Sequence, residues 1–135
     1  MQLSFAHLAD YANVTLDQKL NVMGIFASLA SASFPTVHPD MCVVVQLTAR
    51  SPEYGRKFKV DVRLVDEDGT VIVPFEAELT VPHDDHGLPV NMNLIFRMVN
   101  TVLQKPGSYG VYILVDNDEK GSIPLDVIQI TPPAV

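Results

Sequence analysis

The stretch 82–87, Pro-His-Asp-Asp-His-Gly, is the most reactive-looking part of the sequence. His83, Asp84, Asp85 and His86 are residue types that bind metal ions, so a metal site is one hypothesis for this stretch. The two histidines are three residues apart in an expected loop, outside any helix that would align them, and no second donor cluster has a recognisable spacing. Because Asp and Gly also form turns readily, the sequence favours a solvated turn over a metal site.

Residues 116–121 resemble the start of a calcium-binding loop, with Asp116 and Asp118 in the first and third positions. The fifth position holds Lys120, and the twelfth holds Val127 where an EF-hand needs a bidentate Glu. Both positions are unsuited to calcium, so this segment is predicted to be a turn.

Two further histidines are candidate ligand-binding residues. His7 shares the strand phase of Leu3 and Phe5, which directs it toward apolar surroundings, and His38 precedes Pro39. A buried structural role for His7 and a loop-shaping role for His38 are the favoured interpretations. If the two rings met in space, they would form a polar ligand-binding site at one end of the domain, because imidazole is a common ligand and proton carrier. That site is a hypothesis.

The sequence contains no recognisable motif for nucleophilic catalysis. No Gly-x-Ser-x-Gly elbow and no glycine-rich phosphate loop occurs. Cys42 lies in an apolar segment without an adjacent cation, which favours a packed thiol over an activated one. We therefore predict no catalytic residues and no cofactor, and a non-enzymatic role is favoured. A hydrolase is the least favoured hypothesis, because it would need a deep pocket with a His within reach of a carboxylate and a nucleophile.

The formal net charge of the 135-residue chain is −7, from 16 acidic and 9 basic side chains. An acidic surface repels phosphate groups, so neither nucleic-acid nor membrane binding is predicted. Five of the nine basic residues fall within 50–63, and Lys57, Lys59 and Arg63 occupy the outward face of one expected strand. Self-pairing with nearby acidic residues is favoured over a nucleic-acid site. The acidic residues between and across from them are Asp61, Glu76 and Glu78.

A β-hairpin is the firmest local prediction. Apolar and polar residues alternate along 57–65 and 70–81, which is typical of strands with one buried face, and Asp68-Gly69 between them favours a tight turn. A two-residue loop there would pair Glu67 with Thr70. An odd loop length would need a bulge to keep both apolar faces on one side. The predicted register sets Phe58 opposite Leu79, Val62 opposite Phe75 and Lys59 opposite Glu78.

Further strands are expected at 2–12, 20–30, 41–48, 90–98, 109–115 and 123–130, and 41–48 is apolar on both faces. A helical turn at 97–104 is an alternative, because Ile95, Met98, Val99, Val102 and Leu103 also fit helical spacing. About eight strands joined by short turns predict one all-β domain over residues 1–135. An antiparallel β-sandwich is preferred to a closed barrel, since the prolines fall at strand ends, turns and one outward edge position.

Five stretches along nearly the whole chain, taken in order, carry a resemblance to a known family: 5–10, 19–26, 34–39, 63–69, and 106–109 leading to 115–116. Their sequences start with Phe-Ala-His-Leu-Ala-Asp, Lys-Leu-Asn-Val-Met-Gly, Phe-Pro-Thr-Val-His-Pro, Arg-Leu-Val-Asp-Glu-Asp-Gly and Pro-Gly-Ser-Tyr. Together they resemble an uncharacterised bacterial family of small proteins, grouped as a domain of unknown function with an immunoglobulin-like β-sandwich. The resemblance implies that fold and supplies no activity.

The leading functional hypothesis is a non-catalytic module that binds another protein or assembles with itself. Residues 20–30 and 41–48 are apolar on both faces, which suggests a buried interface, plausibly between copies of this chain. The alternative is small-ligand or metal binding by the loop histidines and aspartates. The lone cysteine, the missing basic leader and the lack of an apolar run near ~18 residues favour a bacterial cytoplasmic protein.

Overall fold

The computed structural model describes residues 1–131, which form nine β-strands and one short 3-10 turn at Ser51–Glu53. The all-β prediction is confirmed, with nine strands in place of the expected eight. The strands are β1 (Gln2–Val14), β2 (Leu20–Phe26), β3 (Ser28–Ser31), β4 (Thr36–Ala49), β5 (Lys57–Val65), β6 (Val71–Thr80), β7 (Val90–Leu103), β8 (Gly107–Val115) and β9 (Asp118–Gln129).

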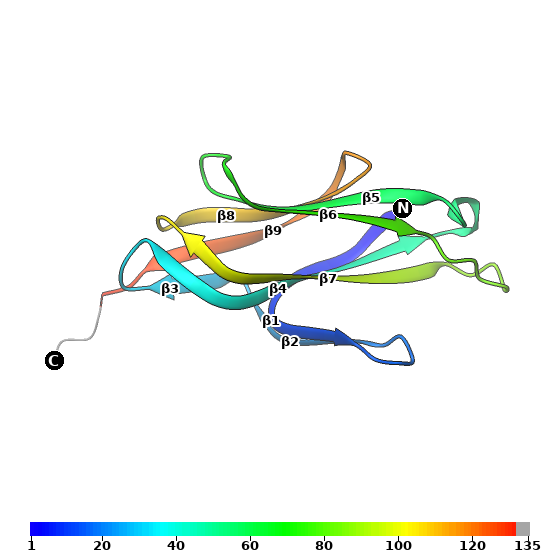
Figure 1. Ribbon diagram of the computed structural model, residues 1–135, viewed down its shortest axis with the longest axis horizontal. Coiled ribbons are helices and arrows are strands. Elements are labelled where there is room, and N and C mark those ends of the chain that lie inside the picture. Colours follow the sequence, from blue (N-terminus) through cyan, green and yellow to red (C-terminus); the bar gives the residue numbers. More distant parts are fainter. Residues whose placement is uncertain (132–135) are drawn as a thin grey trace.

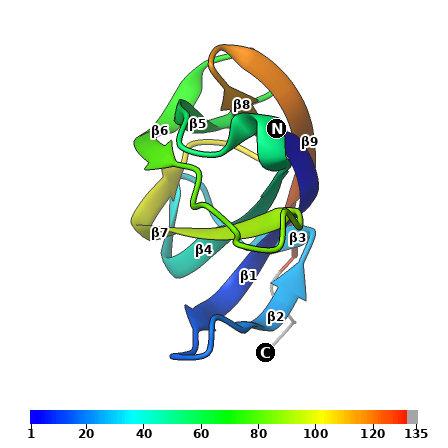
Figure 2. The same ribbon diagram turned by 90° about the vertical axis from the view of Figure 1, so that its right-hand side faces the viewer.

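Two sheets pack against each other (Figure 1). The first, called sheet A, has the strand order β2-β1-β4-β7, and the second, sheet B, has the order β3-β9-β8-β5-β6. Neighbouring strands are antiparallel except β3 and β9, which run parallel. The edge strands β6 and β7 therefore lie along one side of the molecule, with β6 above β7 (Figure 2).

The prediction of one strand over 20–30 is wrong, because the chain changes sheets at Ala27. β2 pairs with β1 in sheet A, whereas β3 pairs with β9 in sheet B. The Ala27 carbonyl accepts a hydrogen bond from the Asp126 N–H at 3.0 Å, which fixes the crossing point. Within β2, Leu20 and Val22 pack on sheet A, whereas Met23 and Ile25 stay exposed.

The β5–β6 hairpin has the predicted register over most of its length, including Phe58 opposite Leu79 and Val62 opposite Phe75. Its turn differs from the two-residue loop that was predicted. The Asp66 carboxylate accepts hydrogen bonds from the N–H groups of Asp68 at 2.9 Å and Thr70 at 2.8 Å, which closes a longer loop. A bulge at 64–65 restores the phase, as an odd loop requires.

β7 is a strand throughout, so the alternative of a helical turn at 97–104 is wrong. It pairs with β4 from Ala49 opposite Val90 to Thr36 opposite Leu103. Asn100 has a left-handed backbone, with φ of 52°, and this interrupts the alternation of faces. Met98 and Thr101 are consequently both buried while Val99 and Val102 are exposed, a spacing that imitates a helix.

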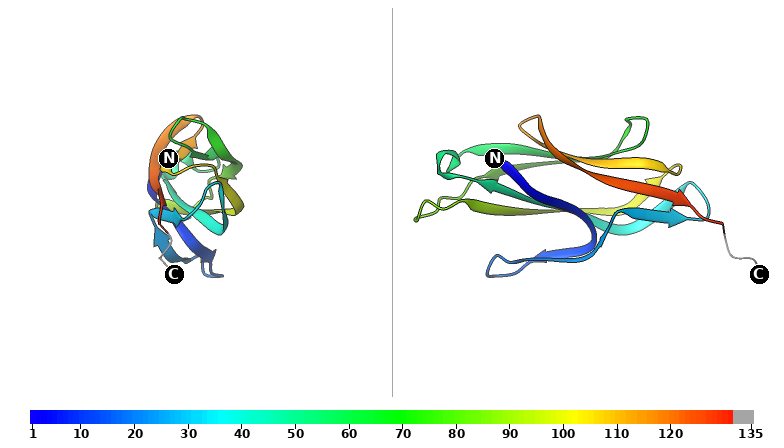
Figure 3. Two further views of the ribbon diagram at one scale, coloured as in Figure 1. Left: turned by 90° about the vertical axis from the view of Figure 1, so that its left-hand side faces the viewer. Right: turned by 180° about the vertical axis from the view of Figure 1, so that it is seen from behind.

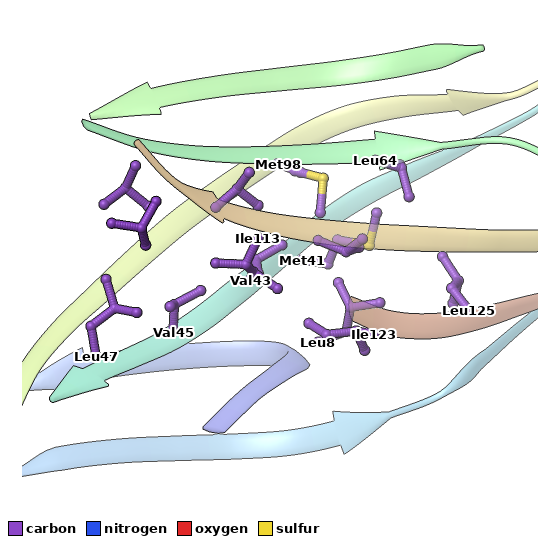
Figure 4. Packing of buried hydrophobic residues seen from close by; sticks show 14 of the residues in the cluster. Leu8, Met41, Val43, Val45, Leu47, Leu64, Met98, Ile113, Ile123 and Leu125 are labelled. Carbon is purple, nitrogen blue, oxygen red and sulfur yellow. The ribbon is translucent and has the colours of Figure 1, made fainter. Parts of the chain in front are cut away.

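The main core lies between the sheets (Figure 4). Sheet A contributes Leu8, Met41, Val43, Val45 and Leu47, all with no exposed surface. Sheet B contributes alternate residues of β5, β8 and β9. These include Val60, Val62, Leu64, Val111, Ile113, Ile123 and Leu125.

A second, smaller cluster lies on the outer side of sheet A. β1 bends sharply near its middle, and the rest of the β1–β2 hairpin turns back beneath the sheet (Figure 3). Ala9, Cys42 and Val44 are buried there, and residues of the hairpin and its surroundings pack over them. The residues that pack over them are Phe5, Ala12, Leu20, Val22 and Ile95. The apolar outer face of 41–48, which suggested an interface between copies, therefore has a cover within its own chain.

β1 leaves the ladder with β4 after Ala9, and the next residue, Asp10, lies opposite Gly24 of β2, whose φ is +71°. A Cβ on Gly24 would lie 2.4 Å from the Asp10 carboxylate, whereas a Cβ on Gly55, with φ of +77°, would meet nothing within 4 Å. Gly55 thus offers a control with the same backbone handedness and open space.

We expect Gly24→Ala to lower the free energy of unfolding by about 2 kcal/mol, and Gly55→Ala by about 1 kcal/mol. The first adds displacement of Asp10 to the left-handed strain that both share. Urea unfolding of the two variants measures the difference. Equal losses would show that Asp10 moves aside freely and that its contact does not define the bend.

Candidate binding surfaces

The stretch 82–87, between β6 and β7, forms a turn closed by its own aspartate. The Asp84 carboxylate accepts hydrogen bonds from the N–H groups of His86 at 3.0 Å and Leu88 at 2.9 Å. The His83 ring packs edge-on against the Tyr54 ring, with 4.9 Å between centroids. Residues 1–131 bring together no group of three or more His, Cys, Asp or Glu side chains suited to a metal ion. The predicted metal site built on His83, Asp84, Asp85 and His86 gains no further ligand from the fold.

His7 and His38 are both on sheet A but are not brought together. His7 pairs with Val44 in the ladder, six residues along β4 from His38. The His7 ring stacks on Phe5 at 5.6 Å, and the His38 ring tilts against Phe26 at 6.1 Å. They line separate cavities, His7 beside β9 and His38 beside β3. A joint site would need a large rearrangement of the sheet.

His38 lies opposite Thr101 in the β4–β7 ladder. This is the end of the core where the left-handed backbone of Asn100 turns the Thr101 side chain inward. The His38 Nε2 is buried and makes no hydrogen bond to any described residue. The cavity that it lines measures about 110 Å³ and has both apolar walls, from Leu29, Leu103 and Val127, and polar ones, from Ser31 and Thr36. Ligand pockets usually enclose roughly 300–1,000 Å³, so this volume suits water better than an organic ligand.

Cys42 lies beside a cavity of about 110 Å³ between the hairpin and the outer face of sheet A. Its thiol donates to the Ala9 carbonyl at 3.5 Å. Burial, followed by the negative charges of Asp40 and Asp10, raises the pKa of the Cys42 thiol. A raised pKa keeps the thiol protonated, so the environment is the reverse of one that activates a nucleophile.

The rim of this cavity carries a two-point ion pair. Arg97 donates from Nε to Asp40 Oδ1 at 3.0 Å and from Nη2 to Oδ2 at 2.8 Å. The hydrogen bonds from the Arg97 guanidinium lower the pKa of the Asp40 carboxyl. The pair joins β4 to β7 on the outer face and neutralises the one charged side chain of β7.

The basic cluster is compensated by acidic neighbours, in line with the expected self-paired face. Lys59 Nζ lies 2.6 Å from Glu76, diagonal to the residue directly across the ladder. Asp61 is only 3% exposed, and its Oδ2 lies 3.9 Å from both the Lys59 and the Arg63 cations. The burial of Asp61 on the outward face is a feature that alternation alone does not predict. On the outward face of the β5–β6 hairpin, the cations Lys57, Lys59 and Arg63 are thus matched in number by the carboxylates Asp61, Glu76 and Glu78.

The segment 116–121 contains a tight turn, as predicted. Asp116 and Asn117 have φ of 49° and 66°, and Val115 pairs with Asp118 across them. The Asp116 carboxylate accepts a hydrogen bond from the Lys59 N–H at 2.9 Å, so it anchors the turn to β5.

Exposed apolar side chains gather on the β1–β2 hairpin. Tyr11 and Met23 are cross-strand partners, and Ile25 follows along β2 opposite Ala9. Leu16 is fully exposed at the tip. We call this set the hairpin patch; its members are Tyr11, Leu16, Met23 and Ile25. Val14 is also exposed, but it pairs with Leu20 on the other face of the hairpin. The sequence marked 20–30, which contains Met23 and Ile25, as apolar on both faces, but it did not identify Tyr11 or Leu16, and nothing local shows that the hairpin turns away from the body.

Residues 4–128 match the model of DUF6941, a family of unknown function. The chain belongs to this family. The DUF6941 match covers both sheets and the hairpin patch, and it names no activity. A comparison with curated proteins gives no match.

Among solved structures, the chain is similar to the alkylpurine DNA glycosylase AlkC of Pseudomonas fluorescens, bound to DNA that contains an abasic site analogue. The two share 16% identity with a TM-score of 0.47, over 91% of this chain and 30% of that one. This similarity is too low to assign a fold or an activity to the DUF6941 chain. In the described residues, no helix has the length and apolar character needed to cross a bilayer.

The packing of the hairpin over Cys42 leads to a labelling prediction. We expect Cys42 to react slowly with iodoacetamide in the folded protein, because its pKa is raised and the hairpin covers it. Val22→Ala removes two methyl groups from the cover and should speed labelling about tenfold through easier local opening. Met23→Ala, an exposed neighbour outside the cluster, serves as the control and should leave the rate unchanged. Mass spectrometry measures both rates; equal acceleration would contradict a cover made by Val22.

Proposed function

We propose that this protein is a non-catalytic module that binds another protein chain through the hairpin patch. The observation that carries the proposal is the exposure of large apolar side chains on one projecting hairpin. Tyr11 is 54% exposed, Ile25 56% and Met23 59%. Aromatic side chains and methionine are enriched at protein interfaces, so the composition of the patch suits that use.

The position of the hairpin supports a binding role over a purely structural one. Ala12, Leu20 and Val22 pack on the second cluster and hold the hairpin against sheet A. The patch therefore sits on a backbone that is already ordered, which reduces the entropy lost on binding. Asp17 and Lys19 near the tip add a charged rim, the usual surround of an apolar contact.

We also infer an immunoglobulin-like fold with one added strand. The order β9-β8-β5-β6 corresponds to strands G-F-C-C′ of a variable-type domain, and β4 beside β7 corresponds to B beside E. β1, between β2 and β4, is additional to that order. A bacterial, cytoplasmic setting is likewise proposed; its support is that Cys42 is the only cysteine and is free and buried.

Lys19 offers a direct test, because it is exposed beside the patch. We expect a lysine-reactive cross-linker to join Lys19 of the tagged protein to a partner in lysate from its source cells. The double variant Met23→Ser, Ile25→Ser should lose that cross-link, because serine removes most of the apolar contact area. Cross-linking mass spectrometry identifies the joined residues.

Val71→Ser is the matched control, since Val71 is 46% exposed on β6, in the other sheet. It should retain the cross-link. Exposed substitutions of this kind change stability by roughly 0.5 kcal/mol each, so melting curves should show all variants folded. A partner captured equally by the double variant would rule out the hairpin patch as its binding surface.

A further inference from the structure

We infer that β7 is the surface through which two copies of this chain associate, each β7 pairing antiparallel with the other. β7 is the last strand of sheet A, so one side of its backbone has hydrogen-bonding groups without a neighbouring strand in that sheet. It is 14 residues long and contains one charged side chain, Arg97, and no proline. An edge of this length and composition is a template for pairing with another strand.

The other edges are protected in ways that β7 is not. β6 contains Pro74, which cannot donate to a ladder, and carries Glu76 and Glu78. β3 has only four residues. β2 has seven and is interrupted at Gly24, where the left-handed backbone breaks the ladder with β1. β7 has a left-handed residue too, Asn100, but the ten residues 90–99 before it form an uninterrupted edge. The contrast within one molecule singles out β7.

A second copy is the occupant that matches this edge, because its β7 has the same length and no uncompensated charge. Two chains of formal charge −7 repel each other, so a stable contact must avoid opposing carboxylates. Pairing of β6 with itself would bring glutamates of both copies to one edge. β7 is neutralised, because Asp40 of the same chain binds Arg97 through two hydrogen bonds. When two β7 strands pair in any register other than Arg97 opposite Arg97, the residue across from each Arg97–Asp40 ion pair is uncharged.

The side chains along β7 would also gain burial. An antiparallel pair that keeps inner faces together has its two-fold axis perpendicular to the sheet. Val99, which is 57% exposed, and Val102, at 42%, then lie in or beside the joined edge. The opening between β6 and β7, about 430 Å³ and lined by Ile72, Val73 and Phe75, would face the same opening in the second copy. Sheet A would continue through both chains as eight strands.

Sedimentation equilibrium of the purified full chain tests the inference. We expect a monomer–dimer equilibrium, with a dimer of twice the 14.8 kDa chain mass, that tightens as salt screens the net charge. Val99→Lys should raise the dissociation constant at least about tenfold, because it places a cation beside Arg97 on the free edge. Val71→Lys adds the same charge at a similarly exposed residue of β6 and should leave the constant unchanged.

A cysteine scan identifies the strand at the contact. In a Cys42→Ala background, single cysteines at Asn91, Asn93 and Ile95 lie on the outer side of β7, and the one nearest the two-fold axis should form an intermolecular disulfide. A protein that stays monomeric at its highest soluble concentration would overturn the inference. So would a dimer that Val99→Lys leaves intact, or one that only the Met23→Ser, Ile25→Ser variant dissociates. The last result would assign self-association to the hairpin patch and leave β7 without a role.

Discussion

β4 must be covered on both faces, and the arrangement of the rest of the chain follows from this requirement. Met41, Val43 and Val45 point toward sheet B, while Cys42 and Val44 point the other way, and all five are almost fully buried. One sheet can cover only one side of a strand. The second cover comes from the β1–β2 hairpin, which can reach it because β1 bends where Gly24 adopts a left-handed backbone. The crossing at Ala27 then takes the chain to sheet B for the first time.

Local patterns predicted the elements better than they predicted the relations between them. Strict alternation gave the β5–β6 register, because a shift of one residue would turn every side chain to the wrong face. The same alternation could not reveal that 20–30 serves two sheets, since each half fits a strand equally well. Asn100 similarly shifts the phase of β7 by backbone conformation alone, and its side chain gives only a weak signal of a left-handed residue.

The candidate sites depended even more on long-range structure. Alternation directed His7 toward apolar surroundings, whereas the loop-shaping role expected for His38 is wrong, because His38 lies in β4 opposite Thr101. Only the β4 ladder sets the six-residue separation that keeps the two histidines apart. The role of Asp84 was predictable from the turn-forming habit of aspartate. The hairpin patch was not, because its residues have the same spacing as core residues. Whether they are buried is decided by the bend in β1, which lies outside their own local pattern.

The two sheets divide the surface by chemistry. On sheet B, the outer face of the β5–β6 hairpin is charged, and Lys59 and Arg63 flank Asp61 there. The apolar exposure used in both proposals lies on sheet A, on the hairpin at one edge and on β7 at the other. A two-fold axis at β7 would place both hairpin patches on the same outer side of the joined sheet. Two weak apolar contacts presented together bind a repeated or symmetric partner far more tightly than either alone, through effective concentration. Self-association at β7 and partner binding at the hairpin would thus reinforce each other without any shared residue.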